Sequence, residues 1–215
     1  MSLQALLAEV DPAWYASGAG AADADAEALP PALLQRALGS RLGRRLLAGG
    51  LAAGPAAHLL APAPGDGFAG LIARWPRARL TALHRDLGAL AYAPAIRAEI
   101  GRDAVRRLKL ALGNSYLLAL DRTVWDGKVE AATQARLADA LREVMASGDD
   151  IAPALFPLLE QQGRAELQAW AARRDTALGD WARLLHPPAG LPPAHLPEKP
   201  VLVLHTHHLS RVITD

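Results

Sequence analysis

Residues 80–120 read LTALHRDLGALAYAPAIRAEIGRDAVRRLKLALGNSYLLAL, and no other part of the chain sustains a helical periodicity for so long. Two series of apolar residues recur there at three- and four-residue steps: Leu80, Leu83, Leu87 and Leu90, then Val105, Leu108, Leu112, Tyr116 and Leu120. Such spacing places one side chain per turn on a common helix face. Pro94 interrupts the pattern, because proline removes a helical hydrogen bond and disfavours helix in the residue before it. The stretch therefore predicts two or three helices.

The composition extends this prediction to the whole chain. Of its 215 residues, 51% are hydrophobic and only 5% aromatic, and the apolar residues are mostly Ala and Leu. Ala and Leu are strong helix formers, whereas the β-branched residues that favour strands are scarce. We expect an all-α fold, a single compact multi-helix domain with a proline-rich C-terminal strap, for which this length is sufficient.

Local composition divides the chain into three parts. Residues 1–29 form an N-terminal segment with a flexible acidic loop, SGAGAADADAEA at 17–28, which lacks large apolar side chains. Residues 30–185 form the helical domain. Residues 186–215 begin with the proline-rich strap HPPAGLPPAHLPEKP and end in a tail that packs on the domain. The tail, VLVLHTHHLSRVITD, fits either a strand or a last helix, and a helix is favoured because no second strand is available to pair with it.

Local signals predict further helix boundaries. Pro30 and Pro31 open one helix that carries leucines as far as Leu47, since proline suits a first turn. An amphipathic helix spans 128–147, and Gly163 separates the next helix from 164–185.

The aromatic residues are predicted to serve the core. Trp170 and Trp181 are eleven residues apart, or about three helical turns, so they share a face and belong to the core. Trp14 and Tyr15 are expected to anchor the N-terminal segment to the core, and an exposed partner-binding anchor is the alternative.

Charge, cysteine content and hydropathy restrict the classes of function. The net charge of +1 gives no global attraction to nucleic acid or anionic lipid, and the absence of Cys removes disulfides and thiolate chemistry. The N-terminus MSLQALLAEVDP lacks a basic region followed by a long apolar core, and no run of 18 apolar residues occurs. We expect a cytoplasmic protein without direct membrane insertion.

A histidine cluster is the sharpest local signal for chemistry. His205, His207 and His208 would place two imidazoles on one side of a strand, where they could hold a metal ion. The string resembles the H-x-H-x-D-H motif of metallo-β-lactamase-like hydrolases, but the Asp and the final His of that motif are absent. No αββα pattern precedes it. Metal binding is thus a minor alternative. No G-x-S-x-G or H-E-x-x-H motif occurs, so we expect no enzyme and no cofactor.

Two basic segments could bind phosphate groups. Four arginines lie between Arg36 and Arg45, and five basic residues lie between Arg97 and Lys109. A helical nucleic-acid-binding module would use either segment and would lose affinity steeply with salt. A solvated polar face is the favoured interpretation of both, because the net charge is near neutral and no helix-turn-helix signature is present.

The stretch 83–120 resembles the YscK/OrgA (SctK) accessory proteins of bacterial type III secretion. The matching positions are Leu87, Gly88, Leu90, Ile96, Arg97, Leu108, Leu112, Gly113 and Leu120. Residues 181–193, WARLLHPPAGLPP, are similar to that family's late Trp-containing helix where it runs into a proline-rich strap. Together the similar segments cover about a third of the chain.

The resemblance implies a non-enzymatic cytosolic adaptor at the cytoplasmic face of the inner membrane. Such adaptors link the cytosolic domain of the inner-membrane ring protein SctD to the SctQ pods of the sorting platform, and through them contact the secretion ATPase complex indirectly. They carry no cofactor and bind no nucleic acid. Arg97, Arg102 and Arg106 become candidate contacts for an acidic partner, because complementary charge assists encounter and register.

Overall fold

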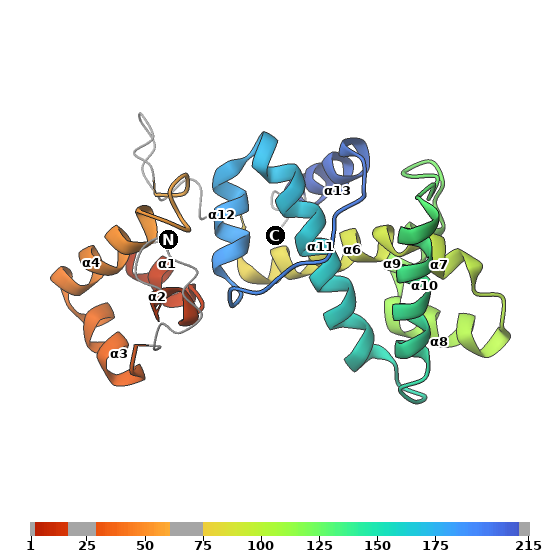
Figure 1. Cartoon of the computed structure of the whole chain (residues 1–215), viewed down its shortest axis with the longest axis horizontal. Coiled ribbons are helices and arrows are strands. Elements are labelled where there is room, and N and C mark those ends of the chain that lie inside the picture. The colour runs from red at the N-terminus through yellow and green to blue at the C-terminus, as the bar shows by residue number, and fades with distance from the viewer. Residues whose placement is uncertain (1–2, 17–28, 61–74, 211–215) are drawn as a thin grey trace. The chain divides into compact units, whose positions relative to one another are not determined.

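The computed structural model describes residues 3–16, 29–60 and 75–210, and the part of the chain so described is built from helices alone (Figure 1). This confirms the all-α prediction. The helices are α1 (Leu3–Glu9), α2 (Ala13–Ala16), α3 (Pro31–Gly39), α4 (Arg41–Ala52), α6 (Arg77–Ala91), α7 (Ala93–Ala98), α8 (Arg102–Leu112), α9 (Asn114–Leu120), α10 (Ala131–Met145), α11 (Ala152–Arg174), α12 (Thr176–Leu184) and α13 (Glu198–Ser210).

The chain folds into two compact units. Unit 1 contains Met1–Arg77 and Ala171–Gly190, and unit 2 contains Ala78–Trp170 and Leu191–Asp215. These limits differ from the composition-based boundaries at 29/30 and 185/186, because each unit combines segments that are far apart in the sequence. The acidic loop expected at 17–28 lies outside the described residues. None of the described helices combines the length and the apolar character needed to cross a membrane.

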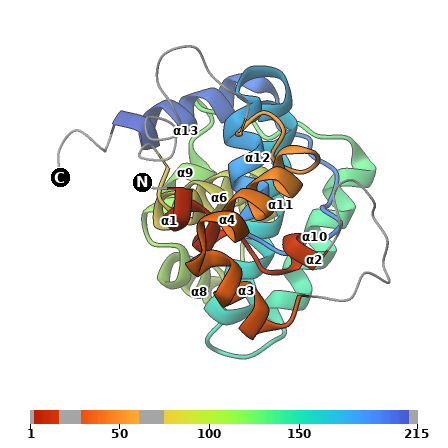
Figure 2. The same cartoon turned by 90° about the vertical axis from the view of Figure 1, so that its left-hand side faces the viewer.

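Unit 1 begins with a pair of short helices, α1 and α2, that pack on the hairpin formed by α3 and α4 (Figure 2). The prediction of one helix from Pro31 to Leu47 is wrong, because Ser40 ends α3 and starts α4. Its backbone is extended, and its hydroxyl oxygen accepts a hydrogen bond from the Gly43 amide at 2.9 Å. A serine in this position satisfies an amide that would otherwise have no partner in the first helical turn.

Hydrogen bonds from two aromatic side chains fasten the N-terminal segment inside unit 1. Trp14 Nε1 donates to the His186 carbonyl at 2.7 Å, and the Tyr15 hydroxyl donates to the Leu7 carbonyl at 2.5 Å. Burial raises the pKa of Tyr15, as desolvation disfavours the phenolate. The predicted anchoring of the segment is therefore borne out for Trp14, whereas the Tyr15 hydrogen bond stays within residues 1–29.

The stretch 80–120 forms four helices in unit 2 rather than two or three. The expected break occurs before Pro94, which occupies the first turn of α7. A further break occurs at Gly113, whose φ of 53° and ψ of −124° separate α8 from α9. Residues with a Cβ rarely adopt this backbone conformation, so the glycine is required by the turn rather than by helix packing.

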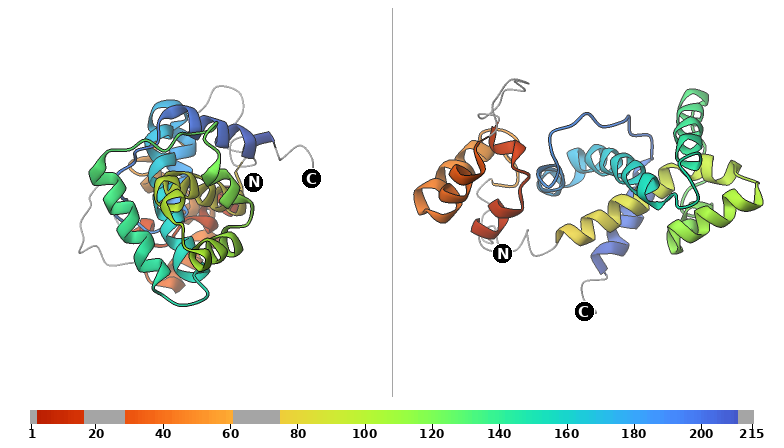
Figure 3. Two further views of the ribbon diagram at one scale, coloured as in Figure 1. Left: turned by 90° about the vertical axis from the view of Figure 1, so that its right-hand side faces the viewer. Right: turned by 90° about the horizontal axis from the view of Figure 1, so that it is seen from below.

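Two glycines allow α6 and α11 to pack with their backbones in contact (Figure 3, right, with α6 in yellow and α11 in teal). A Cβ on Gly88 would lie 2.0 Å from the carbonyl oxygen of Leu159, and a Cβ on Gly163 would lie 1.8 Å from that of His84. The prediction that Gly163 separates two helices is wrong, since it lies inside α11. Its missing side chain serves the close approach of α6.

The C-terminal part of the described chain confirms the strap and the final helix. Residues 186–197 contain no helix, and α13 begins at Glu198, so the last three residues of the predicted strap belong to the helix. Residues 211–215 of the tail are not described. Trp170 and Trp181 are both buried, as predicted. They do not share a helix, however, because Asp175 lies between α11 and α12 and accepts a hydrogen bond from the Leu178 amide.

Candidate partner-binding surface

The three arginines predicted to bind a partner lie in different environments of unit 2. Arg97 is in α7 and partly buried, whereas Arg102 and Arg106 are in the first turns of α8 and exposed. Among the residues that the structure describes, neither Arg102 nor Arg106 makes a hydrogen bond or an ion pair. The two arginines of α8 are therefore available to a partner, and Arg97 has an internal role.

Arg97 holds the segment that follows α9. Its guanidinium donates to four backbone carbonyls, at distances of 2.8 Å to Ala119, 2.8 Å to Asp126, 2.9 Å to Trp125 and 3.4 Å to Asp121. Desolvation and the nearby Arg122 lower the pKa of Arg97, and the carboxylates of Asp126 and Asp121 oppose that shift. The guanidinium has five donors in a fixed fork and can serve all four carbonyls, whereas a lysine ammonium has only three donors.

Arg97→Lys is accordingly expected to lower the free energy of unfolding by about 2 kcal/mol, because several carbonyls lose a charged donor. Chemical denaturation of the purified variant measures this loss. Arg122→Lys is the control, since Arg122 is exposed and its substitution should change stability by less than about 0.5 kcal/mol. Equal stability of the two variants would show that the carbonyl contacts contribute nothing.

The exposed side of α8 combines positive charge with an apolar side chain. We call Arg102, Arg106, Lys109 and Leu110 the α8 face, because their spacing of four, three and one residues places them within about a third of the helix circumference. Leu110 is 84% exposed. The opposite side carries the buried Leu108 and Leu112, so α8 is anchored by other residues and does not need Leu110 for its packing.

Arg107 fixes the orientation of α8 against α10. Its guanidinium donates to the carbonyls of Gly148 at 2.5 Å and Met145 at 3.1 Å, at the C-terminal end of α10. A cation is stabilised at that end of a helix, where carbonyls lack partners. This contact directs Arg107 inward and leaves Arg102 and Arg106 on the outside.

The histidine cluster lies on a helix rather than on a strand. The His205 ring packs on the Trp170 ring with centroids 4.8 Å apart, His207 is exposed, and His208 Nε2 donates to Asp86 Oδ2 at 2.8 Å. The alternation of side chains that a strand would supply is therefore missing. In the described part of the chain, no three His, Cys, Asp or Glu side chains come together as metal ligands would.

Asp86 joins α13 to two other helices of unit 2. Its second carboxylate oxygen accepts a hydrogen bond from the Ser115 hydroxyl at 2.6 Å, so one residue of α6 holds both α9 and α13. His208 is buried, and its contact with Asp86 accounts for a polar group in that position. The contact fastens α13 to α6.

A buried carboxylate attaches the proline-rich strap. Glu166 in α11 is 1% exposed, and its two oxygens accept hydrogen bonds from the backbone amides of His195 and Leu196 at 2.9 to 3.1 Å. Gln162 donates to the same carboxylate at 2.7 Å and to the Pro193 carbonyl at 3.1 Å. The His195 ring completes the attachment, with Nε2 donating to the Ala91 carbonyl at 3.1 Å.

The sequence-based predictions did not include this attachment or the exposed Leu110. Glu166 and Gln162 are four residues apart on one helix, a spacing that signals a shared face but not burial. Leu110 interrupts the apolar periodicity of 105–112 and was for that reason detectable as a residue outside the core. Its position outside the apolar row is the sequence signal that could have identified the α8 face.

We compared the chain with protein families, curated proteins and solved structures. The chain matches no family model, no curated protein and no solved structure.

Proposed function

We propose that the chain is a non-enzymatic adaptor of the bacterial type III secretion sorting platform, which links the cytosolic domain of SctD to SctQ. The support is the resemblance of residues 83–120 and 181–193 to the YscK/OrgA (SctK) family. In unit 2 the matching positions Leu87, Leu90, Ile96 and Leu108 are buried. The resemblance thus concerns the residues that build the helical unit, and the partner surface has to be argued separately.

The α8 face is the observation that carries the proposal. A single exposed leucine is common in proteins, but Leu110 lies beside three cations, and Asp103 is the one acidic side chain of α8 on that side. Within the described part of the chain, Asp103 forms no ion pair with these cations. Arginine is enriched at the energetically dominant positions of interfaces, and an acidic partner would gain both charge complementarity and burial of Leu110. The proposed partner surface on SctD or SctQ is therefore acidic, with an apolar centre.

The test measures binding of the purified chain to the SctD cytosolic domain and to SctQ, each from the same host. We expect Arg102→Glu with Arg106→Glu to weaken binding to one of the two partners at least tenfold, or about 1.4 kcal/mol, without changing thermal stability. The matched control is Arg173→Glu with Lys199→Glu, two exposed cations elsewhere, which makes the same change in net charge.

Two results would contradict the proposal. If the unaltered chain binds neither SctD nor SctQ, and neither protein co-purifies with it from the host, the adaptor function is wrong. If the control variant weakens binding as much as the α8 variant does, the effect is that of net charge and the α8 face is not the contact.

A further inference from the structure

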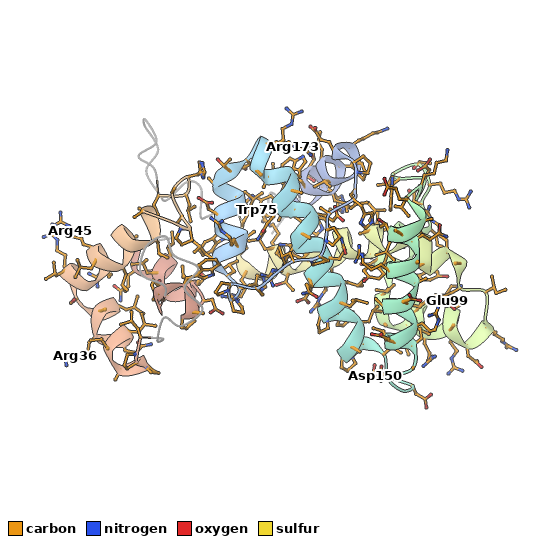
Figure 4. All side chains as sticks on the ribbon, in the orientation of Figure 1. Arg36, Arg45, Trp75, Glu99, Asp150 and Arg173 are labelled. Carbon is orange, nitrogen blue, oxygen red and sulfur yellow. The ribbon has the colours of Figure 1, made fainter. Side chains whose placement is uncertain are left out.

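The only charged residues of the α3–α4 hairpin of unit 1 are arginines, at positions 36 to 45. Residues 29–60 contain four arginines and no Asp or Glu, although the whole chain is nearly neutral. Arg44 donates to the Leu38 carbonyl at 2.8 Å, inside the hairpin. Arg36, Arg41 and Arg45 are exposed, and the described residues supply no hydrogen bond or ion pair to them (Figure 4, where Arg36 and Arg45 are labelled).

Leucines lie exposed beside these arginines. Leu42 and Leu46 are each 69% exposed and Leu33 is 49% exposed. On α4 the arginines 41 and 45 and the leucines 42 and 46 form two adjacent rows, because residues four apart lie one above the other. We call Arg41, Leu42, Arg45 and Leu46 of α4 the hairpin face.

The hairpin face is not needed to hold the hairpin together. Leu34 of α3 and Leu51 of α4 are buried and supply the packing of these helices. Burying a leucine side chain is worth about 1.5–3 kcal/mol, so Leu42 and Leu46, each 69% exposed, leave most of that free energy unused. A ligand that covers them would recover it.

We propose that the hairpin face binds an acidic amphipathic helix of another protein. Such a helix presents leucines at three- and four-residue steps that pack against Leu42 and Leu46, and flanking carboxylates that accept paired hydrogen bonds from Arg41 and Arg45. Charge complementarity identifies this partner, since the surface offers only cations and apolar groups. The proposal rests on unit 1 and is independent of the adaptor function.

The alternative ligands fit the hairpin face less well. An anionic membrane surface would gain about 1 kcal/mol per arginine, but residues 29–60 contain no Phe, Trp or Tyr. The two leucines of the row bury less than one acyl chain, which alone binds marginally. A nucleic acid would use the arginines and gain little from the leucine row. An acidic amphipathic helix can pair its carboxylates with the arginine row and pack its leucines on the leucine row at the same time.

The test uses the full chain labelled with ¹⁵N and a synthetic acidic peptide of about 18 residues, or five helical turns, with Leu on one face and Glu beside it. We expect amide shifts confined to α3 and α4, with a dissociation constant of about 100 µM or tighter. A peptide with Lys in place of Glu should not bind. Leu42→Gln with Leu46→Gln, and separately Arg41→Glu with Arg45→Glu, should each weaken binding at least tenfold, or about 1.4 kcal/mol.

A charge exchange makes the test specific. The Arg41→Glu, Arg45→Glu variant should bind the Lys peptide, and Arg102→Glu with Arg106→Glu should leave binding of the acidic peptide unchanged. The proposal is overturned if the acidic peptide does not bind, or if the Leu42→Gln, Leu46→Gln variant binds it normally. It is also overturned if anionic vesicles, duplex DNA or a second copy of the chain occupy the hairpin face with the same dependence on both rows.

Discussion

Glu166→Ala is expected to lower the free energy of unfolding by about 3–5 kcal/mol and to release the strap from unit 2. The substitution removes a buried charge that accepts hydrogen bonds from two strap amides and from Gln162. Those donors then remain in the interior without an acceptor, and removing one partner from a buried charged network has a cost of this size. Chemical denaturation measures the loss in stability.

Hydrogen exchange locates the effect of this substitution. The amides of His195 and Leu196 should exchange much faster in the variant, while amides of unit 1 should be unaffected. Glu160→Ala is the matched control on the same helix. Glu160 forms a partly exposed ion pair with Arg85, with Nε and Oε1 2.6 Å apart, so its loss should cost about 0.5 kcal/mol. Unchanged protection of Leu196 in Glu166→Ala would show that the strap is held by other contacts.

The second large effect is expected from Gly163→Ala. Alanine usually favours a helix interior over glycine by about 1 kcal/mol, which alone would stabilise α11. Here the added methyl group would lie 1.8 Å from the His84 carbonyl oxygen, and a backbone atom cannot move aside as a flexible side chain can. Overpacking costs about 1–3 kcal/mol and occasionally more, so we expect a net loss of about 2–3 kcal/mol in chemical denaturation.

Gly49→Ala is the control for this prediction. Gly49 also lies inside a helix, α4, but a Cβ there would meet nothing within 4 Å. The propensity term then acts alone, and the variant should be more stable by up to about 1 kcal/mol. If Gly163→Ala raised stability in the same way, α6 and α11 would not be in backbone contact.

Periodicity and composition were sufficient to predict the helical class and most of the core. The leucines at three- and four-residue steps are buried: Leu80, Leu83, Leu87, Leu90, Leu108 and Leu112. Their positions were predictable because a regular apolar row can be recognised within a short window. The sequence does not predict the break at Ser40, and at Gly113 it allows either a break or close packing, while the interpretation of Gly163 as a helix boundary is wrong. Each depends on the backbone conformation or on a neighbour from a distant helix. A local pattern cannot distinguish a glycine that ends a helix from one that admits another helix.

The candidate surface was predicted only in part, because contacts between residues far apart in the sequence cannot be recognised from a local pattern. Arg97, Arg102 and Arg106 look alike in the sequence, yet Arg97 is engaged by carbonyls 22 to 29 residues away. These acceptors are backbone carbonyls, which every residue has, so the amino-acid types at those positions do not reveal them. Whether Arg102 and Arg106 bind a partner remains a prediction.

The carboxylates of Glu166 and Asp86 also constrain the order in which unit 2 can assemble during translation. Glu166 meets an amide 30 residues further along the chain, and Asp86 meets a histidine 122 residues further along. At about 5–20 residues per second, the ribosome delivers these partners about 2–6 s and 6–24 s later. Until the strap arrives, the Glu166 carboxylate is more stable in water than in an apolar interior, so the nascent unit stays open around it. Asp86 meets Ser115 after 29 residues and then lacks only its contact with α13. Arrival of the strap and α13 therefore closes the core of unit 2.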